Sequence, residues 1–437
     1  MRDGGNGTGH MGLKVAVVGA GSTYTPELVE GFTTYQDRLP VDELVLLDID
    51  PARLEVVAGV ARRILAKQGW TGDLVVTTER DRALEGASFV VVQIRVGGQA
   101  ARLVDETLPP RFGCVGQETT GPGGFAKALR TVPVVLELAE ETASRGAPGA
   151  WLIDFTNPVG IVTQALLDDG HRALGLCNVA IGLQRRLAWM LGVPWERVAL
   201  DHVGLNHLSW VRRVEVDGKD HLPDLLERSA GDVAAEVDLP TDLVRLIGAI
   251  PSYYLRYYYL TDEVVREQRS DTHKPRAEEV MEVERDLLRQ YRDPALDHKP
   301  ELLSRRGGAF YSVAATRLMA SLSAGTGDVQ VVDVRNDGAV PDLPADAVVE
   351  IPARVDRDSA RPLTVDPLAP ELLGLVQRAK AYERLAVAAA TTGSRATALK
   401  ALLANPLVPS YGVAAPLLDA LLSANERHLP RFFRRRA

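Results

Sequence analysis

One stretch decides the fold: Lys14-Val-Ala-Val-Val-Gly-Ala-Gly-Ser-Thr-Tyr-Thr-Pro26, in which an apolar run enters a glycine turn and then a helix start. Gly19 and Gly21 let the backbone turn sharply and approach a pyrophosphate, whose charge the N–H groups and dipole of the next helix favour. Ser22 follows in the same turn, and Tyr24 stands where the third glycine of the usual fingerprint would be. A two-glycine turn is also common as a purely structural feature, so the turn alone leaves both interpretations open.

Short apolar runs alternate with helical periodicity from Leu13 to about Cys177, which is typical of βαβ units around a parallel sheet. Thr25 and Asp50, each followed by proline, predict helix starts with a capping side-chain oxygen. Gly69 predicts the end of the second helix. The predicted strands are Lys14–Val18, Glu43–Leu47, Leu74–Thr77, Phe89–Ile94, Trp151–Phe155 and Ala173–Leu176.

Asp48 ends the second predicted strand, 27 residues after Gly21. A carboxylate at this place accepts hydrogen bonds from both ribose hydroxyls of NAD and repels the 2′-phosphate of NADP. We therefore predict NAD as the cofactor, with Gly19, Gly21, Ser22 and Asp48 as its binding residues.

The pattern changes beyond about residue 200, where strands, longer helices and connections rich in Pro and Gly are mixed. We predict an α/β fold with a Rossmann-like, doubly wound parallel sheet that binds NAD in residues 11–200. A second, α+β domain in residues 201–437 is predicted to bind substrate and to carry the oligomer contacts. Within it, the apolar spacing from Glu371 to Leu403 predicts two helices separated near Gly393.

Composition narrows the class of protein further. The 437 residues are 46% hydrophobic with a net charge of −8, so no overall positive field favours nucleic acid or an anionic membrane. Only two cysteines, Cys114 and Cys177, argue against a disulfide framework, and we predict a cytoplasmic location. Residues 1–10 lack the apolar stretch of a signal peptide and are predicted to be a disordered lead-in, and the basic residues 431–436 to be a solvated end.

Recognisable motifs occur at Gly19–Pro26, Ile94–Gly98, Gly116–Gly124, Phe155–Pro158, Leu176–Val179, Gly204–His207, Pro251–Leu255, Arg276–Met281 and Ala381–Leu385. In sequence and in order they resemble the motifs of glycoside hydrolase family 4, in particular its 6-phospho-β-glucosidase branch. The resemblance implies dependence on NAD and on a divalent metal, commonly Mn²⁺, a small phosphorylated glycoside as substrate, and a homodimer or homotetramer.

The resemblance also assigns the metal ligands and the base. Cys177 and His207 match the metal ligands of the family, and Tyr254 matches the tyrosine proposed to remove a sugar proton. Viewed alone, Cys177 is typical of a buried apolar filler and Tyr254 of core packing. A phenol with a pKa near 10 needs a nearby cation to act as a base, and the metal or Arg276 would supply one. Thiolate ligation by itself suggests zinc or iron, so manganese is implied by the resemblance alone.

Four positions match substrate contacts of the family: Arg102, Asn157, Asn178 and Arg276. Guanidinium groups suit anionic or hydroxylated substrates because they donate several hydrogen bonds. Asn157 either donates to a sugar hydroxyl or holds its own turn together. Asn178, directly after the cysteine, resembles the β-specific branch, since α-specific relatives carry aspartate there.

The implied reaction is a sequence of oxidation, elimination, water addition and reduction. Oxidising the hydroxyl on carbon 3 of the sugar acidifies the hydrogen on carbon 2, so that the group on carbon 1 can leave once a base removes that proton. The function predicted is that of a 6-phospho-β-glucosidase. An α-glycosidase or α-galacturonidase of the same family stays open, as do a lactate- or malate-type 2-hydroxyacid dehydrogenase and a non-catalytic NAD-binding sensor.

Overall fold

The computed structural model describes residues 12–308, 310–357 and 359–433, and across them nine strands form one sheet in the order β13-β12-β11-β6-β5-β4-β1-β2-β3. Its parallel part consists of β1 (Leu13–Val18), β2 (Val41–Leu47), β3 (Asp73–Thr77), β4 (Phe89–Val92), β5 (Trp151–Asp154) and β6 (Ala173–Gly175). All six predicted strands are present, within two residues at each end. The strand order reverses at β1, as in a doubly wound Rossmann-like sheet, and the predicted fold class is confirmed. The predicted disordered lead-in lies outside the described residues.

Helices connect the parallel strands: α1 (Thr25–Thr34), α2 (Pro51–Lys67), α3 (Arg80–Leu84), α4 (Gly98–Thr107), η1 (Pro109–Phe112), α5 (Gly121–Arg145) and α6 (Val159–Asp168). The predicted cap at Asp50 is confirmed, because its side chain accepts a hydrogen bond from the Arg53 amide at 3.0 Å. The predicted cap at Thr25 is wrong. Thr25 is already the first helical residue, and its hydroxyl donates back to the carbonyl of Ala20 at 2.8 Å.

Tyr24, which replaces the third glycine, packs α1 against the carboxyl-terminal half of the chain. Its side chain is buried, its hydroxyl accepts a hydrogen bond from the Ser312 amide at 3.2 Å, and its ring meets that of Tyr311 edge-on at 6.0 Å. Both partners belong to α15 (Tyr311–Ala324). The third glycine usually allows the helix to approach the strand closely. Here a bulky side chain takes that place because a second helix lies beside α1.

Three antiparallel strands from beyond residue 200 extend the same sheet: β11 (Asp328–Arg335), β12 (Val348–Asp356) and β13 (Ser359–Pro362). β11 joins the parallel part beside β6, with Asp333 opposite Gly175. This extension was not predicted, and it joins the two predicted domains through one sheet. The boundary at residue 200 itself stays a prediction.

Helices from the end of the chain cover one face of the parallel part. They are α16 (Pro370–Thr392), α17 (Arg395–Ala404), α18 (Tyr411–Ala424), η4 (Glu426–His428) and α19 (Pro430–Phe433). α16 packs against α5 and α6, and its apolar side chains share a core with theirs. Gly393 has a φ of 68° directly after α16, which confirms the predicted break between two helices.

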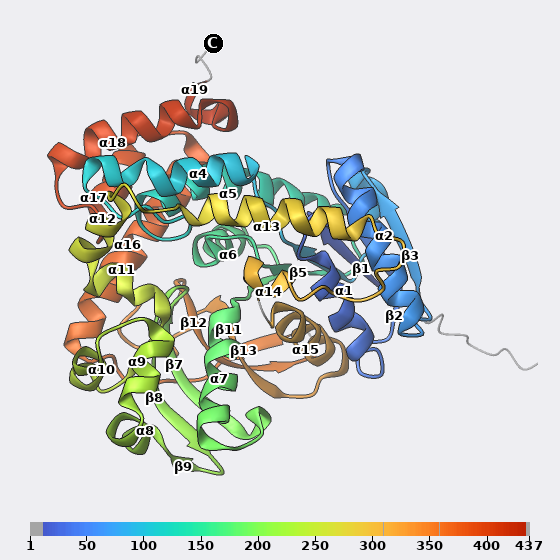
Figure 1. The fold of residues 1–437 in the computed structure, drawn as a ribbon, viewed down its shortest axis with the longest axis horizontal. Helices are drawn as coiled ribbons and strands as arrows, with labels where there is room; N and C mark the ends of the chain where they lie inside the picture. Colours follow the sequence, from blue (N-terminus) through green and yellow to red (C-terminus); the bar gives the residue numbers. More distant parts are fainter. Residues whose placement is uncertain (1–11, 309, 358, 434–437) are drawn as a thin grey trace, which may run out of the picture.

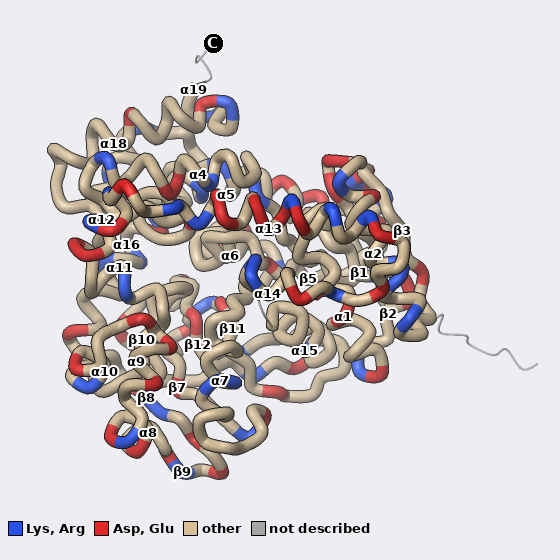
Figure 2. The backbone as a smooth tube through the Cα atoms, viewed as in Figure 1, with Lys and Arg blue, Asp and Glu red and all other residues tan. Residues whose placement is uncertain are grey.

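A smaller antiparallel sheet contains β7 (Val198–Leu205), β8 (Leu208–Val216), β9 (Lys219–Asp220) and β10 (Ile250–Pro251). It lies in the lower part of Figure 1, and β7 contacts β12 of the large sheet. The remaining helices are α7 (Asn178–Leu191), η2 (Trp195–Arg197), α8 (Leu222–Arg228), α9 (Ala230–Val237), α10 (Thr241–Ile247), η3 (Tyr253–Leu255), α11 (Arg256–Tyr259), α12 (Thr261–Gln268), α13 (Arg276–Tyr291) and α14 (Leu303–Arg306). Acidic and basic residues are interspersed over these elements (Figure 2). None of the helices described is both long and apolar enough to cross a membrane.

Candidate active site

The glycine turn after β1 is built as the sequence predicts. Gly19 has a φ of 87°, and a Cβ there would lie 2.8 Å from the carbonyl oxygen of Gln93. The Gly21 amide donates to Asp48 Oδ2 at 2.8 Å, and a Cβ on Gly21 would lie 2.8 Å from that same oxygen. The two glycines therefore leave backbone exposed where a pyrophosphate would approach, beside a half-buried carboxylate at the end of β2.

A partner from the far half of the chain reaches the same turn. Arg306, at the end of α14, donates to Ser22 Oγ at 3.3 Å and to Thr23 Oγ1 at 2.8 Å. Its guanidinium also lies 3.5 Å from Glu284 Oε1. Sequence reasoning missed Arg306, because nothing in the local pattern of residues 303–306 places it beside a turn 284 residues earlier.

Cys177 and His207, the predicted metal ligands, lie together. The Cys177 Sγ is 3.5 Å from His207 Nε2, and both side chains are buried. For comparison, a sulfur and a nitrogen that bind one tetrahedral cation lie about 3.6 Å apart, given bond lengths of about 2.3 and 2.05 Å. The two donors therefore fit a shared cation.

Local structure explains how each ligand reaches this position. Cys177 follows β6 and precedes the first turn of α7, at the carboxyl edge of the large sheet. His207 lies in the two-residue turn between β7 and β8, with a φ of 63°. That backbone conformation is uncommon for a residue other than glycine and is found at functional sites.

Electrostatics affect the two predicted ligands differently: His207 is held neutral, as metal binding requires, whereas the Cys177 thiol would have to lose its proton to bind a cation. Burial lowers the pKa of His207 to about 4, so the imidazole is neutral at pH 7. Burial, with a smaller contribution from Glu350, raises the pKa of the Cys177 thiol. Among the described residues, no cluster of three or more His, Cys, Asp or Glu side chains could hold a metal. Two protein ligands would leave the other coordination positions to water or substrate oxygens, as a catalytic metal requires.

Tyr254 lies directly on this pair. Its ring stacks on the His207 ring with centroids 3.6 Å apart and planes inclined by 10°. Burial, and next Cys177, raise the pKa of Tyr254, whereas the guanidinium of Arg102 acts in the opposite direction. The sequence suggested Arg276 as a cation that would lower this pKa, and in the structure Arg102 is the neighbouring one.

The two arginines predicted to bind substrate differ in burial. Arg102 is buried and pairs with Glu106 at 2.7 Å and with Glu118 at 3.3 Å. The Arg276 side chain is 47% exposed, and its described partners are Glu279 and the carbonyl of Arg305. Its contacts in the structure therefore give no direct support for a role in substrate binding, which stays a prediction.

The two predicted asparagines follow the ends of neighbouring strands. Asn157 comes after β5, and its Oδ1 is buried without a hydrogen-bond partner among the described residues. A buried acceptor of this kind is unfavourable unless a donor arrives, such as a sugar hydroxyl. Asn178 is the first residue of α7, next to Cys177. His202 contacts Glu350 Oε2 through Nε2 at 2.8 Å.

A buried ionic cluster beside the site was missed by sequence reasoning. Glu118 accepts a hydrogen bond from Lys127 Nζ at 2.6 Å and pairs with both Arg95 and Arg102. These cations, Arg95 first, hold the pKa of Glu118 well below its usual range despite burial. Burial, and next Arg95, lower the pKa of Lys127 to about 7. The motif Gly116–Gly124 was the available signal, but charged residues in a sequence are usually assigned to the surface.

Replacing Glu118 with glutamine is expected to lower the free energy of unfolding by about 3 kcal/mol, because three cations lose their common buried counter-charge. Chemical denaturation monitored by circular dichroism measures the change. Glu282→Gln is the matched control, since Glu282 pairs with Lys274 at the surface and its loss should leave the denaturation midpoint unchanged. Equal midpoints for the two variants would contradict the structural importance of Glu118.

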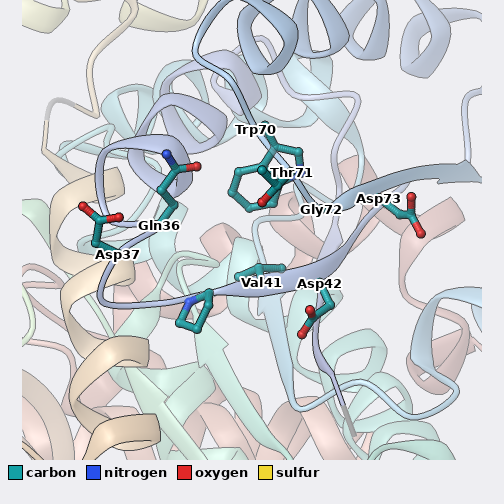
Figure 3. A pocket seen from close by; sticks show the side chains of 9 residues that line it. Gln36, Asp37, Val41, Asp42, Trp70, Thr71, Gly72 and Asp73 are labelled. Carbon is teal, nitrogen blue, oxygen red and sulfur yellow. The ribbon is translucent and has the colours of Figure 1, made fainter. Parts of the chain in front are cut away.

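Two hollows lie apart from the stacked pair of His207 and Tyr254. One, of about 510 Å³, is at the amino-terminal ends of β2 and β3, where Trp70 stands among Asp37, Asp42 and Asp73 (Figure 3). Ligands of open α/β sheets bind at the carboxyl ends of the strands, so this hollow is on the wrong edge for the dinucleotide. The other, of about 280 Å³, touches Cys177 from the side of α7 and β11.

The structure brings Asp48 to the glycine turn, and brings Cys177, His207 and Tyr254 into contact with one another. Both arrangements suit the predicted class, a Rossmann-type enzyme that uses a dinucleotide and a metal. The family 4 glycosyl hydrolase model matches residues 14–193, and the model of the family 4 glycosyl hydrolase C-terminal domain matches residues 202–408. This chain belongs to glycoside hydrolase family 4.

Relatives that match nearly the whole chain support this family assignment. A probable 6-phospho-β-glucosidase of Bacillus subtilis is 42% identical over 97% of this chain and 98% of its own. The 6-phospho-β-glucosidase of Thermotoga maritima is 35% identical, over 95% of this chain and 99% of its own. Its structure with NAD and glucose 6-phosphate has a TM-score of 0.90 to this one, over 95% of this chain and 99% of that one. A lactate dehydrogenase, at 15% identity and a TM-score of 0.53, shares the fold alone.

Proposed function

We propose that this chain cleaves 6-phospho-β-glucosides with NAD⁺ and a divalent cation, preferably Mn²⁺. The observation that carries the proposal is the stacking of Tyr254 on His207, whose Nε2 faces the Cys177 sulfur 3.5 Å away. Tyr254 as a proton acceptor, in contact with a pair of residues that can hold a cation, suits the removal of a proton next to a carbonyl group. The named relatives support the substrate: those called 6-phospho-β-glucosidases are 35 to 42% identical, and those named for α-glycosides 28 to 31%.

Different residues of this chain would bind the cofactor, the cation and the sugar. When bound, NAD⁺ supplies a hydride acceptor and the cation supplies charge stabilisation for the developing enolate. Cys177 and His207 would hold the cation, and the turn with Gly19, Gly21, Ser22 and Asp48 would hold the dinucleotide. Tyr254, through its phenolic oxygen, would take the proton from carbon 2 of the sugar. Asn157 would accept a hydrogen bond from a sugar hydroxyl at its unpartnered Oδ1.

An excess of buried or half-buried cations supports a phosphorylated substrate. Two groups of such side chains hold more cations than carboxylates: Arg53 and Arg306 face Glu284, and Arg95 and Arg102, with Lys127 when it is protonated, face Glu106 and Glu118. Surplus positive charge away from water is unfavourable unless an anion binds. A sugar phosphate supplies that anion and accepts several charge-assisted hydrogen bonds.

A panel of 4-nitrophenyl glycosides tests the substrate, with α and β anomers, each with and without a 6-phosphate. Under reducing conditions with NAD⁺ and Mn²⁺, we expect release of nitrophenol mainly from the phosphorylated β-glucoside. Asn178, unlike the aspartate of α-specific relatives, cannot donate a proton as an acid, which disfavours the α anomer. A preference for that anomer or for uronides would move the chain to another branch of the family.

Turnover in heavy water tests the reaction type. A base that removes the proton on carbon 2 and returns one from solvent leaves deuterium on that carbon of the released sugar, without net NADH formation. Direct hydrolysis would leave only protium there, and a 2-hydroxyacid dehydrogenase would accumulate NADH. NMR of the product soon after cleavage, before other exchange, distinguishes the three.

We further propose a cytoplasmic homodimer or homotetramer. The two free, buried cysteines, Cys114 and Cys177, support a reducing compartment. Light scattering of the purified protein measures the assembly, and a monomer at all concentrations would contradict it.

A further inference from the structure

The hydroxyl of Thr119 bridges two side chains at the active site. Its Oγ1 lies 3.0 Å from His207 Nδ1 and 2.9 Å from Gln117 Oε1. Thr119 is buried and comes from the segment just before α5, 88 residues before His207. No motif role had been assigned to Thr119 or Gln117.

Counting protons fixes the direction of both hydrogen bonds. Gln117 Oε1 also accepts from the amides of Thr119 at 2.5 Å and Thr120 at 2.7 Å, so this atom is the carboxamide oxygen and cannot donate. The hydroxyl of Thr119 has a single proton, which must go to Gln117. The Thr119 oxygen is then left to accept a hydrogen bond from His207, and the donor is the N–H at Nδ1.

We propose that Thr119 is a positioning residue, which fixes His207 as the Nδ1–H tautomer and so directs the free electron pair of Nε2 toward Cys177. The inference rests on the proposed function, because it gives Nε2 the role of a metal ligand. Neutral imidazole carries one N–H, so a proton held on Nδ1 leaves Nε2 able to bind a cation. Metal-binding histidines commonly have their other ring nitrogen anchored in this way.

The contacts around Thr119 make the anchor rigid. The side chain of Gln268, at the end of α12, donates to the Gly116 carbonyl and accepts from the Gly116 amide, each at 2.8 Å. The segment that carries Gln117 and Thr119 is therefore tied at its start to α12 and continues into α5. Since Tyr254 stacks on the same imidazole, the ring orientation that Thr119 sets also supports the position of the base.

Nitrogen-15 NMR of metal-free protein with labelled histidine tests the tautomer directly. The chain has 8 histidines, and the loss of one signal set in His207→Asn assigns His207. We expect the Nδ1–H form in the wild-type protein and in Thr119→Ser, which keeps the hydroxyl. Thr119→Val, which has nearly the same shape, should shift His207 toward the Nε2–H form. An Nε2–H tautomer in the wild-type protein would overturn the inference.

Mn²⁺ binding, followed by electron paramagnetic resonance of the free ion, tests the consequence. Thr119→Val should weaken binding by about 10- to 100-fold, the usual effect of losing a partner of a metal ligand. Thr119→Ser should restore it. Thr131→Val is the matched control, because Thr131 is fully buried on α5 and its hydroxyl has no described hydrogen-bond partner. Wild-type affinity in Thr119→Val, or equal weakening in Thr131→Val, would contradict a positioning role.

The two experiments separate this inference from the proposed function. A wild-type protein that bound no Mn²⁺ would contradict the proposed function, while the spectrum of the metal-free protein would still support or overturn the tautomer. Circular dichroism checks that each variant is folded. If Thr119→Val were unfolded, the tautomer of the wild-type protein and of Thr119→Ser would decide the question.

Discussion

Tyr254→Phe is expected to lower kcat by about 10²- to 10⁴-fold, the range associated with removing a general base. The change removes the phenolic oxygen but keeps the ring that stacks on His207 at 3.6 Å. The metal ligands and the substrate contacts should therefore stay in place, and KM should change little. Steady-state kinetics with the phosphorylated β-glucoside measure both constants, and deuterium at carbon 2 of the product should appear at the same reduced rate.

Tyr253→Phe provides the matched control for that result. Tyr253 is adjacent in sequence, but the residue is 39% exposed and its hydroxyl lies 3.5 Å from the hydroxyl of Tyr257 rather than at the ligand pair. We expect its kcat to match the wild-type value. Comparable loss in both variants would assign the effect to aromatic packing, and full activity in Tyr254→Phe would exclude Tyr254 as the base.

Cys177→Ser is expected to weaken Mn²⁺ binding by at least about 100-fold, since losing a ligand should exceed the effect of losing a ligand's partner. A serine hydroxyl does not ionise at neutral pH and is a poor replacement for a thiolate. Turnover that depends on Mn²⁺ should almost disappear. NAD⁺ binding should persist, because the dinucleotide turn is built by β1, α1 and β2. Titration with Mn²⁺ and calorimetric titration with NAD⁺ measure the two effects separately.

The other cysteine supplies the control for this prediction. Cys114 is also buried, but its sulfur contacts only the Phe112 carbonyl, at 3.9 Å, among the described hydrogen-bond partners. Cys114→Ser should therefore retain metal binding and turnover. Mn²⁺-activated turnover at the wild-type rate in Cys177→Ser would remove Cys177 from the metal site.

Some parts of the site could be predicted from the residues themselves, and others only from the resemblance to the family. Gly21 and Asp48 could be paired from the sequence because two consecutive parallel strands place their carboxyl ends side by side. The structure places the Gly21 amide against the Asp48 carboxylate, a contact that was not itself predicted, and the role of both residues in NAD binding stays a prediction. Cys177, His207 and Tyr254 came from the family resemblance. Their contact depends on a turn in one sheet and a strand end in another, which no spacing along the chain specifies.

The roles of Glu118 and Thr119 could not be predicted from the sequence, because they depend on which residues surround these side chains in the folded protein. Glu118 looks like a surface residue until Arg95, Arg102 and Lys127 surround it. Thr119 looks like a turn residue until His207, far along the chain, places a ring nitrogen against its hydroxyl. The charge state of Glu118 and the hydrogen bonds of Thr119 depend on burial and on their neighbours. Both are set only when distant segments of the chain pack together.

The sequence by itself determined the parallel sheet, its strands and the dinucleotide turn, because hydrophobic periodicity and glycine freedom act over a few residues. It also determined the family, through motifs along nearly the whole chain. Only the tertiary structure decided that β11, β12 and β13 extend the first sheet, that Tyr24 packs on α15, and that Arg276 lies outside while Arg102 lies inside. These outcomes depend on which apolar faces and which charges meet across long sequence separations. Local propensities carry no information about such encounters.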